Sequence, residues 1–177
     1  TIERVCVFSP NPAHAREFAS KMAGHGPIPS DVRVAENPRE AVAEADIICT
    51  ATTSYRPVFC GADLQPGVHI NSVGSYMPAM QEVDSETIQR ALVIVDSVES
   101  VLAEAGDLII PIQDGLISKD HIHAELGEVV GGTKSGRTSD NQTTFFKSCG
   151  LAVQDAAAAQ LALVQAERLD LGIETVL

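Results

Sequence analysis

Four short segments that follow predicted strands contain most of the side chains that could bind a ligand or do chemistry. They are "FSPNP" (8–12), "TATTSYRP" (50–57), "SVGSYMP" (72–78) and "DSVES" (96–100), and three of the four are rich in Ser, Thr, Gly and Pro. In an open parallel sheet, ligands bind beyond the carboxyl ends of the strands, where small residues let the backbone approach a sugar-phosphate. Ordinary strand-to-helix turns have the same composition, so both interpretations stay open from spacing alone.

The glycine-rich fingerprint of dinucleotide-binding proteins, G-x-G-x-x-G directly after a strand, is missing from this sequence. "GHGPIP" (24–29) lacks the last glycine and follows a predicted helix, and "GGTKSG" (131–136) has the wrong spacing. Taken literally, this argues against nucleotide binding. However, "VCVF" (5–8) already reads as a buried strand, so we expect a fold that is entered at its second strand, without the glycine-rich turn.

Other polar side chains are weaker candidates. His121 and His123 alternate like one face of a strand, but without acidic or cysteine partners at ligand spacing they favour surface or core histidines over a metal site. Asp96 and Asp155 are isolated carboxylates. Cys149 precedes Gly150 near the start of the predicted long helix, where a helix dipole would lower the thiol pKa, yet the absence of a nearby histidine favours a packed thiol.

Strands and helices alternate along the first hundred residues, which predicts an α/β fold with a parallel sheet of Rossmann type, covered on both faces by helices. The pattern predicts strands at 4–8, 32–34, 46–52, 68–74 and 92–97, and helices at 11–24, 37–45 and 123–132. An alanine-rich run predicts one long helix from about Thr143 to Leu171. The helix at 11–24 is predicted by apolar residues at helical spacing with Gly24 after its end, and the helix at 37–45 by Asn37 as N-cap with Pro38 at its first position.

Composition limits the class of protein. The chain has 177 residues, which suits one domain, and carries 12 basic against 24 acidic residues, a net charge of -12. No Lys/Arg cluster favours nucleic acid, and no apolar run is long enough for a membrane span. The four cysteines show no metal spacing and three lie in apolar runs, which predicts packed thiols in a reducing cytoplasm.

Several segments, taken together and in order, closely resemble the ornithine cyclodeaminase/mu-crystallin family. They are "EADIICTATTSYRPVF", "LQPGVHINSVGSYMPAMQEVD", "ALVIVDSVESVLAEAGDL", "GEVVGG" and "GRTSDNQTTFFKSCGLAVQDAAAA". The resemblance covers nearly the whole chain. It implies an NAD(P)-dependent enzyme with a Rossmann-type domain and a second domain that forms a homodimer and much of the substrate pocket.

On this resemblance, residues 1–142 form the NAD(P)-binding domain without its first strand and glycine turn. Residues 143–177 form a long helix and tail that partly return to the second domain, which lies outside this chain.

The resemblance also implies the site, residue by residue. The expected cofactor contacts are Ser9, Thr52, Val73, Gly74, Ser75 and Ser148, and Cys149 is expected to face the substrate. Ser9 stands where an acidic residue would select NAD, so it leaves room for a 2′-phosphate and favours NADP, with Arg16 as a possible phosphate partner. No metal is expected.

Tyr76 departs from the cyclodeaminases of this family, because the resemblance implies an aspartate at this position in them. Met80 likewise stands where the resemblance implies a cofactor-contacting lysine in the cyclodeaminases. A tyrosine with a reference pKa of about 10 does not serve as a carboxylate base at neutral pH. Tyr76 could instead donate a hydrogen bond to substrate or simply wall off the nicotinamide.

The resemblance therefore implies an oxidoreductase that acts on a small amino acid or cyclic imino acid, such as a ketimine or pyrroline-2-carboxylate. Two alternatives are the conversion of ornithine to proline with release of ammonia, and a crystallin-like protein that binds NADP and a ligand with little catalysis.

Overall fold

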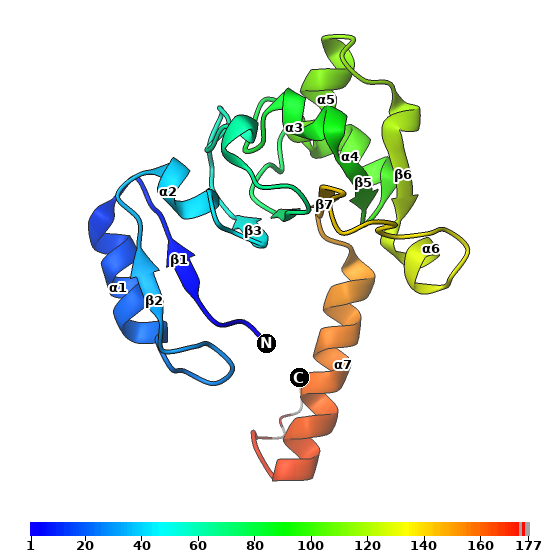
Figure 1. Cartoon of the computed structure of the whole chain (residues 1–177). Coiled ribbons are helices and arrows are strands. Elements are labelled where there is room, and N and C mark those ends of the chain that lie inside the picture. The colour runs from blue at the N-terminus through cyan, green and yellow to red at the C-terminus, as the bar shows by residue number, and fades with distance from the viewer. Residues whose placement is uncertain (174, 176–177) are drawn as a thin grey trace.

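The computed structural model describes residues 1–173 and 175 and contains two parallel β-sheets flanked by helices (Figure 1). The smaller sheet has two strands, and the larger has five in the order β3-β4-β7-β5-β6. The strands are β1 (Val5–Val7), β2 (Val32–Val34), β3 (Ile47–Thr50), β4 (His69–Ser72), β5 (Leu92–Val95), β6 (Ile122–Glu125) and β7 (Thr144–Lys147). The predicted α/β class with parallel strands is confirmed, and the five strands predicted from apolar runs are all present.

The helices begin where side chains satisfy the free backbone N–H groups of the first turn. Asn11 caps α1 by accepting from the Ala13 N–H, Asn37 caps α2, and Asp84 caps α3 by accepting from the Thr87 N–H. The helices are α1 (Pro12–Met22), α2 (Pro38–Val42), α3 (Ser85–Arg90), α4 (Val98–Glu104), α5 (Gly106–Gln113), α6 (Leu126–Val130) and α7 (Ala152–Leu169), with 3-10 turns at Gly61–Asp63 and Lys119–His121.

The last strand in the chain, β7, lies in the middle of the larger sheet, between β4 and β5. The sequence prediction of a helix from about Thr143 is therefore wrong over its first part. Residues 144–147 form a strand because Phe145 packs at 0% exposure in the core between its neighbours, a tertiary contact that the alanine-rich stretch after it conceals. The helix itself begins only at Ala152.

The core of the larger sheet is formed by apolar side chains of β4, β5 and β7 together with α3, α4 and α5. Ile70, Val93, Val95 and Phe145 are all at 0% exposure. At about 25 cal/mol per Å² of buried apolar surface, such side chains each contribute on the order of 1.5–3 kcal/mol.

The β3 end of the larger sheet is covered on one face only, contrary to the expectation of helices on both faces. Ile48 packs with Val42 of α2 in the core, while Ile47 is 56% exposed and Cys49 is open to solvent. The same alternation leaves Cys6 of β1 exposed, so the prediction that three cysteines are packed in the core is wrong. Strand alternation placed these thiols on the uncovered face.

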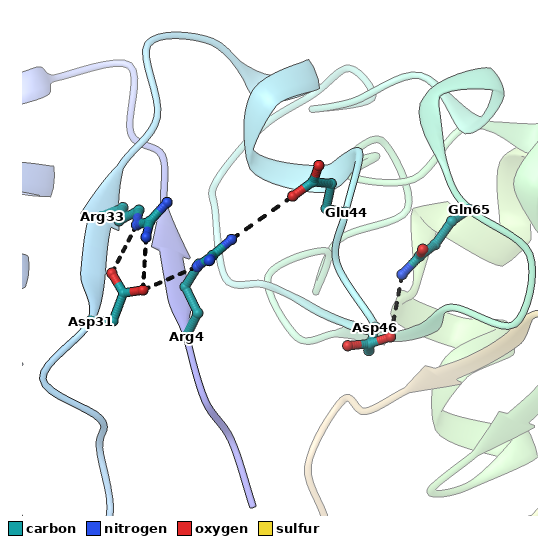
Figure 2. Close-up of polar contacts among 6 residues, drawn as sticks. All are labelled: Arg4, Asp31, Arg33, Glu44, Asp46 and Gln65. Atoms are coloured by element: carbon teal, nitrogen blue, oxygen red, sulfur yellow. Dashed lines mark hydrogen bonds and ion pairs between the residues drawn. The ribbon is translucent and has the colours of Figure 1, made fainter.

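The small sheet β1-β2 lies beside the β3 end of the larger sheet (Figure 1). Within the described residues, β1 pairs only with β2 and β3 only with β4, so each of the two has an edge without a ladder partner. Surface ion pairs lie in this region (Figure 2). Asp31 accepts from Arg33 at 2.8 Å and from Arg4 at 3.1 Å, and Arg4 lies 3.9 Å from Glu44.

Helix α7 extends away from the larger sheet (Figure 1), and none of its residues is buried. Its exposed apolar side chains include Leu161 at 62% and Leu163 at 55%. Among the described residues, no helix is long and apolar enough to cross a membrane.

Candidate functional site

The carboxyl ends of β3, β4 and β7 lie side by side, because the three strands are neighbours and run parallel. The turns after them carry Thr52, Val73–Tyr76 and Ser148, which we call the strand-end cluster. Backbone hydrogen bonds join these turns: the Val73 N–H donates to the Thr50 carbonyl at 2.9 Å and the Ser148 N–H donates to the Ser72 carbonyl at 3.2 Å. The structure therefore brings together most of the site residues that the sequence suggested.

Within the turn after β4, side chains alternate between solvent and core. Val73 is 53% exposed and Tyr76 is 52% exposed, whereas Ser75 is fully buried. The Ser75 hydroxyl donates to the Met80 carbonyl at 2.8 Å and accepts from the Asp107 N–H at 3.3 Å. Ser75 therefore fixes the turn from within the core, while Val73 and Tyr76 present their side chains to solvent.

Gly74 is required by the packing of the protein itself. A Cβ at this position would collide with the backbone of Thr52 and with the Glu82 carboxylate. The sequence suggested that the glycine lets the backbone approach a ligand, but the structure shows that it lets two strand-end turns approach each other.

Glu82, which sequence reasoning did not single out, holds these two turns together. Its carboxylate accepts from the Thr52 N–H at 2.5 Å, the Gly74 N–H at 2.8 Å and the Thr50 hydroxyl at 2.9 Å, and lies 3.1 Å from the Ser72 hydroxyl. The side chain has 0% exposure. The local sequence "PAMQEVD" does not mark this carboxylate as buried, because its hydrogen-bond partners lie on other segments of the chain.

Asp107 and Lys147 lie buried beneath the same turns, both at 0% exposure. Asp107 accepts from the Glu82 N–H at 2.7 Å and the Val83 N–H at 3.1 Å, and the Lys147 ammonium donates to the Ser72 carbonyl at 3.3 Å. Burial raises the pKa of Asp107 above its usual range and lowers the pKa of Lys147 below its own. The two opposite charges partly offset these effects, because Lys147 lowers the pKa of Asp107 and Asp107 raises the pKa of Lys147.

Asp96 fixes the turn after β7. One of its carboxylate oxygens accepts from the Ser148 hydroxyl at 2.9 Å, the Cys149 N–H at 2.9 Å and the Gly150 N–H at 2.8 Å, and the other accepts from the Ser97 N–H at 2.8 Å. These four bonds engage both oxygens, so Asp96 is suited to holding the loop and poorly suited to acting as a base.

Cys149 is half-buried, and desolvation raises the pKa of its thiol to about 11. The residue lies outside α7, which begins at Ala152, so a helix dipole does not lower this pKa. The structure thus supports the packed, neutral thiol and not an activated nucleophile.

The family comparison covers almost the whole chain: the model of the ornithine cyclodeaminase/mu-crystallin family matches residues 1–168. The chain belongs to this family. It is 45% identical over 160 residues to a delta(1)-pyrroline-2-carboxylate reductase of Bacillus cereus, covering 90% of this chain and 48% of that protein. It is 42% identical over 148 residues to the ketimine reductase mu-crystallin of Mus musculus, covering 84% of this chain and 42% of that protein.

Solved structures of other members agree with the fold. The Thermococcus litoralis delta(1)-pyrroline-2-carboxylate reductase in complex with NADH and L-proline superposes with a TM-score of 0.92 and 42% identity, covering 98% of this chain and 53% of that one. An archaeal alanine dehydrogenase dimer with bound NAD superposes with a TM-score of 0.86 and 31% identity, covering 99% of this chain and 53% of that one. The chain spans about half the length of the relatives it matches.

Some residues suggested for this ornithine cyclodeaminase/mu-crystallin family member lie apart from the strand-end cluster. Ser9 follows β1 in the smaller sheet, where its hydroxyl accepts from the Asn11 N–H at 3.2 Å, and Arg16 is exposed on α1. His121 and His123 bond to the carbonyls of Ile88 and Ser135, respectively. No group of three potential metal ligands occurs in the part of the chain that the structure describes.

Met80, at the position of the lysine in cyclodeaminases, is 1% exposed and packs under the turn after β4. Tyr76 stands free: its hydroxyl forms no hydrogen bond to any residue that the structure describes. The phenol is thus the polar side chain of the turn that remains available to a ligand.

Proposed function

We propose that the native protein is an NAD(P)-dependent oxidoreductase that reduces a cyclic ketimine such as delta(1)-pyrroline-2-carboxylate, with this chain forming much of its nucleotide-binding part. One observation carries the proposal: the turns after β3, β4 and β7 converge into a rigid edge that exposes Val73 and Tyr76. The similarity to pyrroline-2-carboxylate and ketimine reductases at 42–45% identity supports it.

The residues present fit a nicotinamide cofactor at this edge. Val73 offers an exposed apolar surface for a planar ring, and Gly74 brings the backbone turns close together. Thr52 and Ser148 lie beside them on the neighbouring turns, with hydroxyl oxygens that retain capacity to accept hydrogen bonds. We propose that these residues contact the cofactor, that the buried Ser75 holds their turn in place, and that Cys149 faces the substrate.

When bound, a reduced nicotinamide would supply a hydride to the carbon of the C=N bond of a protonated imine, which leaves the neutral amine and the oxidised cofactor. The exposed Tyr76 phenol donates a hydrogen bond to the imine nitrogen or to the substrate carboxylate, or shields the ring from water. A phenol does not replace a carboxylate base, so ammonia-releasing cyclisation of ornithine is the alternative that Tyr76 disfavours.

For the choice of dinucleotide we propose NADP. Support comes from Ser9 at the end of β1, because a hydroxyl there does not repel a 2′-phosphate as a carboxylate would. Arg16 is exposed one turn into the helix that follows and offers a positive charge.

We further propose that α7 leads into a second, dimer-forming domain, and that another parallel strand joins the two sheets into one. The exposed apolar side chains of α7 and the unpaired edges of β1 and β3 support this organisation. We propose that the nucleotide-binding part extends past residue 142 through Thr144–Lys147, and the central place of this strand in the larger sheet supports that extension. A cytoplasmic location remains a prediction from the sequence.

The test is a turnover assay with the intact native protein. We expect oxidation of NADPH, and more slowly of NADH, with delta(1)-pyrroline-2-carboxylate, and no proline from ornithine. Dinucleotide binding without turnover of any cyclic imine would favour the crystallin-like alternative, and proline formation from ornithine would contradict the role given to Tyr76.

A further inference from the structure

A single buried hydroxyl lies between two carboxyl groups beneath the strand-end cluster. The Ser72 Oγ is 2.6 Å from Asp107 Oδ2 and 3.1 Å from Glu82 Oε2, and all three residues have 0% exposure. A serine hydroxyl has one proton, so it donates to only one of the two. The other contact requires that a carboxyl oxygen itself carries a proton.

The hydrogen-bond partners indicate which oxygen that is. Glu82 Oε2 already receives the Thr50 hydroxyl and the Gly74 N–H, and a proton there would face other donors. Asp107 Oδ1 receives two backbone N–H groups, whereas the partner of Oδ2 among the described residues is the Ser72 hydroxyl, at the shorter distance. A proton on Asp107 Oδ2 satisfies every one of these contacts.

We propose that Asp107 is a neutral carboxylic acid that donates to Ser72, which in turn donates to an ionised Glu82, and that this chain of bonds positions the Thr52 and Gly74 turns for the cofactor. Glu82 and Asp107 are positioning residues, since neither is exposed to a ligand. The inference that these turns are positioned for a cofactor rests on the proposed function.

The charges around the group agree with this assignment. Lys147 is buried against the Ser72 carbonyl, and no ion pair within 4.0 Å links it to a carboxylate in the described part of the chain. With Asp107 neutral, the buried Lys147 cation keeps the Glu82 and Asp96 carboxylates as anionic neighbours, while the charge of Lys147 partly opposes the rise in the pKa of Asp107. Burial also raises the pKa of Asp107, which favours the protonated form.

The experiment compares variants that differ only in what they can donate or accept. Asp107→Ala removes the acid, while Asp107→Asn restores an oxygen for the two N–H groups and an N–H for Ser72. Glu82→Gln replaces one carboxylate oxygen by an amide NH2 group, which would face the N–H and hydroxyl donors that now bond to Glu82. Asp114→Asn, at the exposed end of α5, is the matched control.

In the intact native protein, we expect Asp107→Ala and Glu82→Gln each to speed hydrogen exchange at the Thr52 and Gly74 amides. Both should weaken NADPH binding by about tenfold or more. Asp107→Asn should restore most of the slow amide exchange and most of the NADPH affinity. Thermal unfolding reports whether each variant folds. Failure of Asp107→Asn to recover them would show an ionised Asp107, and wild-type behaviour of Glu82→Gln would overturn its positioning role.

Infrared spectroscopy keeps the proposal testable if a variant does not fold. Wild-type protein with isotope-labelled aspartate should show the C=O stretch of a buried protonated acid at neutral pH, and its absence would overturn the assignment. If the wild-type protein binds neither dinucleotide, the proposed function fails, while amide exchange at Thr52 and Gly74 still decides whether Glu82 and Asp107 hold the turns.

Discussion

The two sheets of this protein differ in how completely their strands are supported. In the larger sheet, β4, β5 and β7 are flanked on both edges, packed by helices and tied at their carboxyl ends by three buried ionisable side chains, Glu82, Asp107 and Lys147. The smaller sheet has two short strands, exposed alternate residues and surface ion pairs. The comparison indicates that the rigid part of the candidate site is built on β3, β4 and β7, whereas the end proposed to select the dinucleotide rests on the less supported β1.

Truncating one apolar side chain in each sheet is the strongest test of this comparison. Phe145→Ala in β7 should lower the free energy of unfolding by about 3–5 kcal/mol, because a fully buried ring leaves a cavity. Val7→Ala in β1 of the smaller sheet, where the side chain is only partly buried, should cost less, on the order of 1 kcal/mol. Denaturant unfolding measures both, and equal losses would contradict the difference between the regions.

A smaller effect is expected from adding one methyl group at the joint between the β3 and β4 turns. Gly74→Ala should destabilise the protein by about 1–3 kcal/mol and weaken dinucleotide binding, because the new Cβ meets the Thr52 backbone and Glu82. Gly127→Ala, where a Cβ meets nothing within 4 Å, is the control and should be neutral or slightly stabilising. Calorimetry and fluorescence titration give the two readouts.

The pH at which the Cys149 thiol ionises should show how far the turn beside Asp96 is shielded from water. Burial raises its pKa from the usual 9.0 to about 11, so the folded state keeps a proton that the unfolded state releases between these values. Any stability gained from this thiol is therefore present below pH 9 and is lost as the pH rises toward 11. The rate of alkylation at Cys149 should be low at neutral pH and should level off only near pH 11, and rapid reaction at neutral pH would contradict a packed thiol.

The smallest effect is expected in the small sheet. Arg4→Ala breaks the contacts to Asp31 and Glu44 shown in Figure 2, but both pairs are largely exposed, so the loss of stability should stay below about 1 kcal/mol. Thermal unfolding at low and high salt measures it. A larger, salt-dependent loss would mean that surface charges do stabilise this region.

Sequence reasoning found the elements that local signals specify. Asn37 marks a helix start through its capping side chain, and apolar runs mark the first five strands. The helix predicted at 123–132 was wrong over its first part, because Ile122–Glu125 form β6 beside β5. Sequence reasoning also missed β7, because Thr144–Lys147 has a strand signal too short to separate from the alanine-rich helix that follows, and only pairing with β4 and β5 determines its structure.

For the site, strand-end composition pointed to the turns that carry Thr52 and Val73–Tyr76, but the individual residues were expected from the family resemblance. Ser148 came from the resemblance alone, because the strand before it was not predicted. The orientations within those turns could not be read in this way: Ser75 points into the core and Val73 outward. Glu82 and Asp107 were also missed, because a carboxylate's partners lie on distant segments and leave no local pattern.

The central place of β7 also has a consequence for how the protein reaches its native state. β4 and β5 are separated by a strand that is synthesised more than 40 residues after both, so their facing edges stay open until residues 144–147 arrive. Non-local pairing of this kind slows folding and exposes strand edges to association with other chains. We expect refolding to be slow and its yield to fall at high protein concentration. Insertion of β7 between β4 and β5 should be the rate-limiting step.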